Sequence, residues 1–222
     1  MDIKVKFKTG GVVKATYQHF KNGYVKNPLC ANIHGIGYIG IGKHKPSINR
    51  KNTIEYEIWH SMLKRCYDPY IINKQLTYQN AIVCKSWHNF QNFAEWCKEN
   101  YYEIPNERTE LDKDIIKKSN KIYSPEYCSF VPKSINCLLT KSNNARGCCP
   151  IGVCFDKNKY KSQINIDGKR KHLGYFSAPI DAFGVYKKAK EKYIKVMANK
   201  YKNVLNINVY NSLIKYNVEI TD

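Results

Sequence analysis

The sequence predicts an α+β chain in which a strand–strand–helix (ββα) unit with preceding helices is followed by a three-stranded antiparallel sheet packed on one long helix. Three observations predict this fold class. First, the strand-like runs ELDKDI (110–115) and CSFV (128–131) lead into the helix-like PKSINCLL. Second, three strand-like runs lie between residues 151 and 176, two of them joined by Asp167-Gly168, a strong hairpin signal. Third, a helical period extends from there to about residue 201.

These patterns divide the chain into four regions. Residues 1–50 mix strand-like runs with glycine, residues 51–142 hold two helices and the ββα unit, and residues 148–202 hold the sheet and long helix. Residues 203–222 form a tail that we expect either to pack back on the body or to pair with another chain. The polar, glycine-containing stretch at 140–147 is the expected boundary before the sheet.

Gly35, Gly37 and Gly40 in the first region formally match the G-x-G-x-x-G pattern of dinucleotide-binding folds. That fold needs the glycines to end a strand and to open a helix, whereas here they lead into Lys43-His44-Lys45-Pro46 and a polar linker. We therefore expect turns or a basic loop that touches phosphate.

Two amphipathic helices are expected before the ββα unit. The first begins at Ile54 and ends near Asp68-Pro69, with an apolar face that includes Trp59 and Leu63. The second follows the short strand QNAIVC, and Ser86 is its expected N-cap. Its aromatic stripe is more typical of a core than of a base-stacking platform.

The composition restricts the partners that such a chain binds. Lysine and arginine total 37 against 18 acids, a formal net charge of +19, which favours a polyanionic partner. A membrane binder would carry a basic amphipathic helix with a wide apolar face or a lipidation signal, and neither is found. The N-terminal segment lacks the apolar core of a signal peptide, so we expect no membrane partner and an intracellular location.

The nine cysteines do not predict a zinc site. Six of them are scattered singly, mostly at apolar-periodic positions, and are expected to be small core residues: Cys30, Cys66, Cys84, Cys97, Cys128 and Cys137. The one cluster, Cys148, Cys149 and Cys154, contains no C-x-x-C pair. We expect no zinc.

The second strand of the C-terminal sheet predicts two different faces. Tyr160, Ser162, Ile164 and Ile166 alternate with polar residues and are expected to meet the long helix. Six lysines or arginines lie between residues 157 and 172 against the single acid Asp167. A small sheet with such a face can read base edges in the major groove of DNA while other lysines hold phosphates. The candidate DNA-binding residues are Lys157, Lys159, Tyr160, Lys161, Gln163, Asn165, Lys169, Arg170, Lys171 and His172.

The same residues carry a resemblance to a known family. Residues 150 to about 200 resemble the Apetala or ethylene-response-factor type DNA-binding domain found in phage and mobile-element proteins. The motifs that carry the resemblance are, in order, G-V-x-F-D-K, I-x-I-D-G-K, H-L-G-Y-F and D-A-F-x-x-Y-x-x-A-K. The resemblance implies binding of double-stranded DNA through the sheet. The family often has a tryptophan and arginines where this chain has Tyr160, Lys161 and Gln163.

Residues 54 to 139 carry a second resemblance. This segment is similar to phage proteins described as HNH-type endonucleases in four motifs: W-x-x-M-x-x-R-C-Y, V-C-x-x-W-x-x-F-x-x-F-x-x-W, L-D-K-D-I and Y-S-P-E-x-C-x-F-V-P-x-x-I-N. In such proteins an HNH module followed by an Apetala-type domain recurs, commonly in homing endonucleases. The resemblance implies Asp112 and Asn136 as ligands of Mg²⁺ or another divalent cation, and Asn120 as the residue that orients the base.

The base position of that motif falls on Lys113, and a protonated lysine cannot accept a proton from water. Nearby acids favour its charged form. Asp114, His60 and His88 are the alternatives for that role. We therefore expect an intracellular double-stranded DNA-binding protein of a phage or mobile element, located in the bacterial host cytoplasm if it is phage-encoded. It is either a metal-dependent endonuclease that nicks DNA or a non-catalytic regulator or host-takeover factor derived from one. An RNA-binding protein would instead need an aromatic stacking face, for which only Tyr160 and Tyr175 are candidates.

Overall fold

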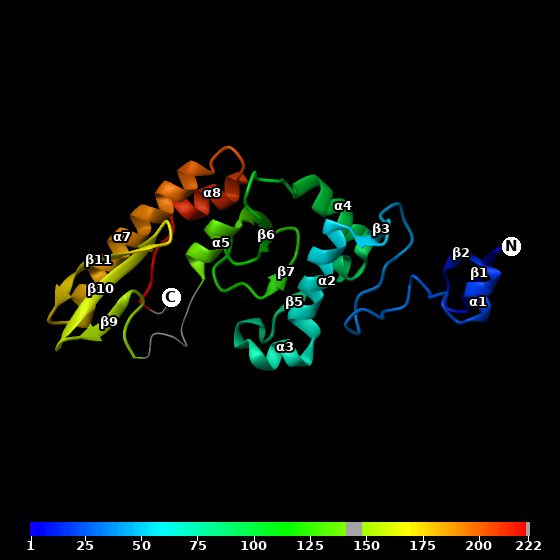
Figure 1. Ribbon diagram of the computed structural model, residues 1–222, viewed down its shortest axis with the longest axis horizontal. Helices are drawn as coiled ribbons and strands as arrows, with labels where there is room; N and C mark the ends of the chain where they lie inside the picture. Colours follow the sequence, from blue (N-terminus) through cyan, green and yellow to red (C-terminus); the bar gives the residue numbers. More distant parts are fainter. Residues whose placement is uncertain (141–147, 221–222) are drawn as a thin grey trace. The chain divides into compact units, whose positions relative to one another are not determined.

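The computed structural model describes residues 1–140 and 148–220 and has a mixed α+β fold. The described part contains seven α-helices and several small sheets, including one three-stranded antiparallel sheet (Figure 1). None of the helices described is long and apolar enough to cross a membrane. Most of the boundary stretch expected at 140–147 lies outside the described residues.

The chain forms two compact units. The first consists of Met1–Tyr101 and Lys117–Ser129, and the second of Tyr102–Ile116 and Phe130–Asp222. The strand–strand–helix segment therefore contributes β6 (Thr109–Asp112) and α5 (Lys133–Leu139) to the same unit as the C-terminal sheet, while the loop between its two strands belongs to the first unit from Lys117 on.

The first unit is built on two helices, α2 (Ile54–Tyr67) and α4 (Phe90–Asn100), which pack against each other. Trp59, Met62 and Leu63 on α2 are fully buried, as are Phe90 and Phe93 on α4. The expected apolar stripes are therefore core, and α2 ends at Asp68 as predicted. The other elements of this unit are β1 (Asp2–Lys6), β2 (Val12–Thr16), α1 (Tyr17–Lys21), β3 (Ser47–Ile48), β4 (Lys51–Asn52), α3 (Pro69–Lys74), η1 (Leu76–Tyr78), β5 (Ile82–Val83), η2 (Lys85–His88) and β7 (Ile122–Tyr123).

The expected cap of the second helix was wrong. Ser86 lies inside the short 3-10 turn η2, and α4 begins only at Phe90, where the Asn89 side chain accepts a hydrogen bond from the Gln91 backbone N–H. Asparagine caps a helix as well as serine does, so the cap chemistry was right and its position was three residues early.

The glycine-rich stretch is a loop held against both helices, as the expectation of turns implied. A Cβ added at Gly37 would lie 2.4 Å from Leu63 Cδ1 of α2. A Cβ at Gly40, whose φ is +75°, would lie 2.1 Å from the Asn89 Oδ1 atom that caps α4. These glycines allow close packing of backbone on side chains, which explains them without a nucleotide.

In the second unit, β6 (Thr109–Asp112) pairs with β8 (Ser129–Pro132), and α5 (Lys133–Leu139) follows directly. The predicted order of strand, strand and helix is therefore present. Strand β8 is buried along its length, and Val131 and Ile135 belong to a core that also contains residues of the C-terminal sheet and long helix.

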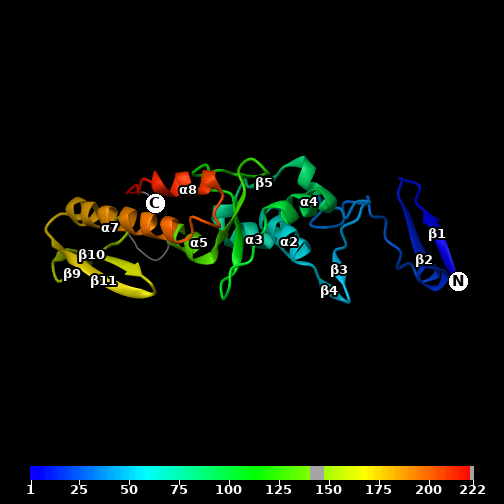
Figure 2. The same ribbon diagram turned by 90° about the horizontal axis from the view of Figure 1, so that it is seen from above.

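The C-terminal sheet has the order β11-β10-β9, formed by β9 (Val153–Asp156), β10 (Lys159–Ile166) and β11 (Lys169–Phe176). All its pairings are antiparallel, and Asp167 and Gly168 both have positive φ in the hairpin turn, as predicted. Helix α7 (Pro179–Lys200) packs on this sheet (Figure 2). Its N-cap is Ala178, which makes no side-chain hydrogen bond.

The tail packs back on its own chain. Helix α8 (Ile207–Ile214) lies along α7 and buries Val209 and Leu213 completely (Figure 1). Beyond it, the Lys187 ammonium donates to the Val218 carbonyl, and Glu191 accepts from the Val218 N–H. The tail is thus part of the second unit's core.

The expectation for the six single cysteines holds only in part. Cys66, Cys97 and Cys128 are buried, but Cys30 and Cys137 are exposed and Cys84 is half-buried. Cys30 lies in a loop, and Cys137 lies on α5 two residues from the buried Ile135, on a different side of the helix.

One hydrogen-bonded cluster joins α5 to the end of α7 within the second unit. Glu107 accepts hydrogen bonds from the Ser134 backbone N–H at 2.7 Å and from the Tyr201 hydroxyl at 2.5 Å. The Ser134 hydroxyl in turn donates to the Tyr201 oxygen at 3.2 Å. Because the N-cap of α5 is Pro132, which offers no side-chain acceptor, Glu107 supplies the missing cap from a distant part of the chain.

The Glu107 cluster makes the stability of the second unit depend on pH. Burial raises the pKa of Glu107, but the hydrogen bonds from Tyr201 and Ser134 outweigh it, so the pKa lies below its ordinary value. A carboxyl with a lowered folded-state pKa stabilises the fold above the unfolded-state pKa, and this contribution is lost as the pH falls through the folded-state pKa. Glu107→Gln should therefore cost about 1–3 kcal/mol at neutral pH and much less in acid.

Urea unfolding followed by far-ultraviolet circular dichroism, with amide exchange in α5 as a local probe, measures this difference. All three tryptophans lie in the first unit, so their fluorescence serves as the internal control. The matched variant is Glu103→Gln at an exposed position. An equal loss of stability in acid and at neutral pH would contradict the assigned role of the carboxylate.

Candidate functional site

Strand β6 and helix α5 bring an acid and an amide together. The Asn136 Nδ2 atom on α5 donates a hydrogen bond to Glu110 Oε2 on β6 at 2.6 Å. This contact orients the amide, because the donating nitrogen is committed to Glu110 and Oδ1 becomes the atom able to bind a cation. The sequence interpretation named Asn136 but missed Glu110. The alternation of Glu110 with Asp112 along a strand, which places both on one face, was the available signal.

The second expected ligand, Asp112, caps the turn that follows β6. Its Oδ1 accepts hydrogen bonds from the backbone N–H groups of Asp114 and Ile115, both at 2.7 Å. Burial raises the pKa of the Asp112 carboxyl above its ordinary value, and the two N–H donors oppose that shift only in part. The carboxylate therefore has a structural role as well as a position on the same strand face as Glu110.

The residue at the base position, Lys113, forms an ion pair with its neighbour. Lys113 Nζ lies 2.6 Å from Asp114 Oδ2, and the lysine side chain is only 7% exposed. The two groups that the sequence placed around the attacking water are thus bonded to each other. The protonated Lys113 has no lone pair and cannot act as a general base, whereas Asp114 uses one oxygen in the ion pair and keeps a second oxygen that can accept a proton.

The residue expected to orient the base, Asn120, and the remaining candidates for the base, His60 and His88, lie in the first unit and have other contacts. Asn120 bonds both the N–H and the carbonyl of Ile122 and so closes its own turn. His88 Nε2 lies 3.0 Å from the Val83 carbonyl oxygen. The His60 ring lies 4.8 Å from that of His34, and burial, with smaller effects of His34 and Lys64, lowers its pKa. Asp112, Asp114 and Asn136 belong to the second unit.

The two expected metal ligands, Asp112 and Asn136, can offer a metal ion only oxygen atoms. Magnesium prefers oxygen ligands and commonly keeps one or two protein carboxylates, with water and substrate phosphate completing its shell. Asp112 and the Asn136 Oδ1 atom fit that chemistry. Among the residues described, no three His, Cys, Asp or Glu side chains come close enough together to hold a metal ion.

The C-terminal sheet presents a second candidate site, on the face opposite α7. Direct cross-strand partners share a face, so the pairs Lys161 with Tyr175, Gln163 with His172 and Asn165 with Arg170 identify the outer side. The pairs Tyr160 with Phe176 and Ile164 with Lys171 lie on the side of the core. Lys159 joins the outer face through its pairing with Asp156.

This outer face carries an aromatic residue that the sequence interpretation left off the binding face. Tyr175 is 41% exposed, and its hydroxyl donates to Asp156 Oδ2 at 2.8 Å. The Lys161 ammonium lies 6.0 Å from the centre of the Tyr175 ring, and the His172 ring lies 4.9 Å from it on the same face. Regular pairing counted from the Asp167-Gly168 turn would place Tyr175 opposite Tyr160 on the core side. The register irregularity between Ser162 and Gln163 instead pairs Tyr175 with Lys161, so the sequence held no signal for its position.

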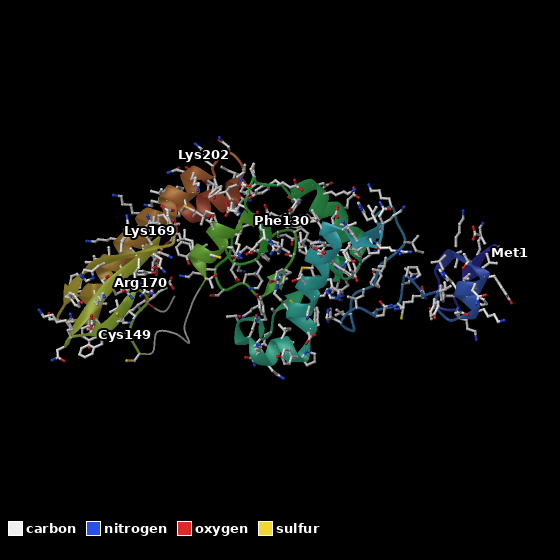
Figure 3. All side chains as sticks on the ribbon, viewed as in Figure 1. Met1, Phe130, Cys149, Lys169, Arg170 and Lys202 are labelled. Atoms are coloured by element: carbon white, nitrogen blue, oxygen red, sulfur yellow. The ribbon has the colours of Figure 1, made fainter. Side chains whose placement is uncertain are left out.

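The ten candidate DNA-binding residues are therefore divided between faces. Arg170 and His172 lie outward, whereas Lys169 and Lys171, exposed as they are, pair with residues of the core side. Figure 3 shows Lys169 and Arg170 beside each other at the start of β11. Tyr160 packs against the core, as the alternation predicted, and Lys157 lies in the β9–β10 turn with a positive φ.

Comparison of the chain with protein-family models, with curated proteins and with solved structures finds no match.

Replacing Asp112 separates its turn-capping role from its charge. Asp112→Asn keeps the Oδ1 acceptor for both backbone N–H groups, whereas Asp112→Ala removes it at a cost of about 1–2 kcal/mol. An acid whose folded-state pKa is raised stabilises the fold below its unfolded-state pKa, and this contribution is lost as the pH rises through the folded-state pKa. The asparagine variant should therefore be at least as stable as the native chain at about pH 7 and relatively less stable at about pH 3.

Denaturant titrations at the two pH values, read in the second unit by circular dichroism, test this expectation. If the asparagine variant lost as much stability as the alanine variant at neutral pH, the carboxylate charge and not the turn cap would be the stabilising feature.

Proposed function

We propose that the chain is a double-stranded DNA-binding protein and that the outer face of the β9–β11 sheet is its contact surface. The observation that carries the proposal is the register, which gathers Lys161, Gln163, Asn165, Arg170 and His172 on the one face of the sheet that α7 does not cover. Arginine pairs with guanine, and glutamine or asparagine pairs with adenine, in the major groove. The face therefore combines phosphate-binding charge with side chains able to read bases.

Helix α7 is rich in lysine, but two of its lysines are not available for contact with DNA. Lys187 is engaged by Glu191 and by the tail residues Asn217 and Val218. Burial lowers the pKa of Lys190 to about 8. Those two lysines stabilise or pack within the second unit, so the sheet and not the helix is the expected contact with DNA.

A second candidate function, phosphodiester hydrolysis, is favoured by the Glu110–Asn136 contact beside Asp112. In this proposal Asp112 and Asn136 hold a divalent ion, which would stabilise the leaving oxygen when bound. Glu110 positions the Asn136 amide through their hydrogen bond. The lysine at the base position argues for the alternative, a non-catalytic DNA-binding protein derived from a nuclease, because the Lys113 ammonium, paired with Asp114, has no lone pair to accept a proton.

Binding by the sheet face predicts a difference between two neighbouring residues. Arg170→Ala should weaken binding to duplex DNA by about 1–3 kcal/mol, since it removes an outward-facing cation with bidentate donors. Lys171→Ala removes the same formal charge from the opposite side and should cost well under that amount. Fluorescence anisotropy with a labelled duplex at fixed salt measures both. Equal losses would mean that only net charge matters and would exclude the outer face as the contact surface.

Hydrolysis is tested by incubating supercoiled plasmid with the chain and Mg²⁺ or Mn²⁺. If the second unit is a nuclease, nicking should appear and should be lost in Asp112→Asn, which retains the turn cap, and should fall in Glu110→Gln, which weakens the hold on Asn136. Both variants should still bind duplex DNA. Tight binding by the native chain with no nicking under either metal would establish the non-catalytic alternative.

A further inference from the structure

The N-terminal β-ribbon, β1 with β2, has one apolar and one cationic side. In its antiparallel register, Ile3 pairs with Ala15 and Val5 with Val13 on one side. On the other side Lys4 pairs with Lys14 and Lys6 with Val12, so Lys6 lies diagonally across from Lys14, and the pair of Asp2 with Thr16 ends this face. All three lysines are exposed. Figure 1 shows the two strands paired, with α1 beside them.

The Lys4–Lys14 pair is unfavourable for the ribbon alone. Side chains directly opposite in an antiparallel pair have Cβ atoms about 4.5–5.5 Å apart, and like charges there destabilise the sheet, whereas opposite charges stabilise it. The ion pairs recorded for the described residues include none of these three lysines. The ribbon therefore holds a cluster of positive charge that its own fold does not neutralise.

The surrounding sequence adds to this charge. The first 26 residues contain six lysines, which are Lys4, Lys6, Lys8, Lys14, Lys21 and Lys26, and the single acid Asp2. All six lysines are exposed. A solvated face that served solubility alone would mix both signs.

Lysines on exposed strands also prevent edge-to-edge pairing with other chains. One lysine on each strand prevents edge-to-edge pairing at any position along the strand. If an acid lay opposite that lysine, the edge would still be protected and the ribbon would be more stable. The directly opposed pair is unexplained by edge protection, but it is expected where the face meets an external polyanion.

We infer that the Lys4, Lys6 and Lys14 face of the N-terminal ribbon binds the phosphate backbone of duplex DNA, as a contact separate from the C-terminal sheet. This inference rests on the proposed function for the identity of the polyanion. A two-stranded ribbon fits the major groove, where phosphates line both edges. Lysine acts as a point charge without bidentate geometry, so this contact is independent of base sequence and adds affinity instead of specificity.

The test is the salt dependence of DNA binding by the full chain. Each phosphate neutralised contributes about 0.9 to the slope of log affinity against log salt, so Lys4→Gln, Lys6→Gln and Lys14→Gln together should reduce that slope by about 2.7. Between about 50 and 200 mM salt, the native chain should then lose about 40-fold more affinity than the triple variant. The matched control replaces the same lysines with arginine, which keeps the charge and should keep the slope.

A second readout separates binding from a structural role. Removing the like-charge pair should slow amide exchange in β1 and β2 of the free triple glutamine variant, even as DNA binding weakens. If the lysines only protected the strand edges, the variant would instead self-associate in sedimentation experiments with an unchanged salt slope, and the inference would be overturned.

Arg170→Ala measured in parallel separates this inference from the proposed function. An unchanged slope in the ribbon variant with weaker binding by Arg170→Ala overturns the inference and leaves the sheet surface standing. The reverse result supports the ribbon and removes the sheet, and no DNA binding by the native chain overturns both. Lysine-dependent binding to anionic phosphatidylglycerol vesicles or to single-stranded RNA, with duplex binding unaffected, assigns the ribbon a different partner and also overturns the inference.

Discussion

The hydrogen bonds of Glu107 are the constraint on which the geometry of the second unit depends. They connect the chain before β6, the first turn of α5 and the end of α7, segments up to 94 residues apart. Helix α5 is only seven residues long and begins after a proline, so its own sequence caps it poorly. The external carboxylate sets where α5 begins, and so where Asn136 lies relative to Glu110. The candidate acid–amide pair and the packing of the long helix thus share one anchor.

The elements that the sequence predicted well are those with local signals. The α2 stripe around Trp59, the positive-φ turn at Asp167-Gly168 and the ββα order each depend on residues within one helix or hairpin. The cap of α4 was misplaced because Ser86 and Asn89 are equally good caps three residues apart. Only the packing of Trp87, fully buried in its short turn, distinguishes them, and packing is not a local property.

The parts of the candidate sites that escaped prediction depend on contacts distant in sequence. Alternation along β6 places Glu110 on the face of Asp112, but the role of Glu110 depends on its contact with Asn136, 26 residues later. The outward position of Tyr175 follows from the register irregularity between Ser162 and Gln163, which composition alone does not predict. The tail had no recognisable motif, yet Val209 and Leu213 are fully buried, because an amphipathic segment of eight residues gains its structure from the surface that it covers.

The second unit uses its polar and charged side chains in two different ways, and the difference bears on its chemistry. Near β6 they are satisfied internally: Lys113 by Asp114, Asn136 by Glu110 and the Asp112 oxygen by two backbone N–H groups. On the sheet, Arg170, His172 and Asn165 are exposed on one face. Binding to DNA costs little rearrangement on such a face. Hydrolysis at Asp112 would need a general base in place of the protonated Lys113, whereas the proposed binding needs only the side chains that are already exposed on the sheet.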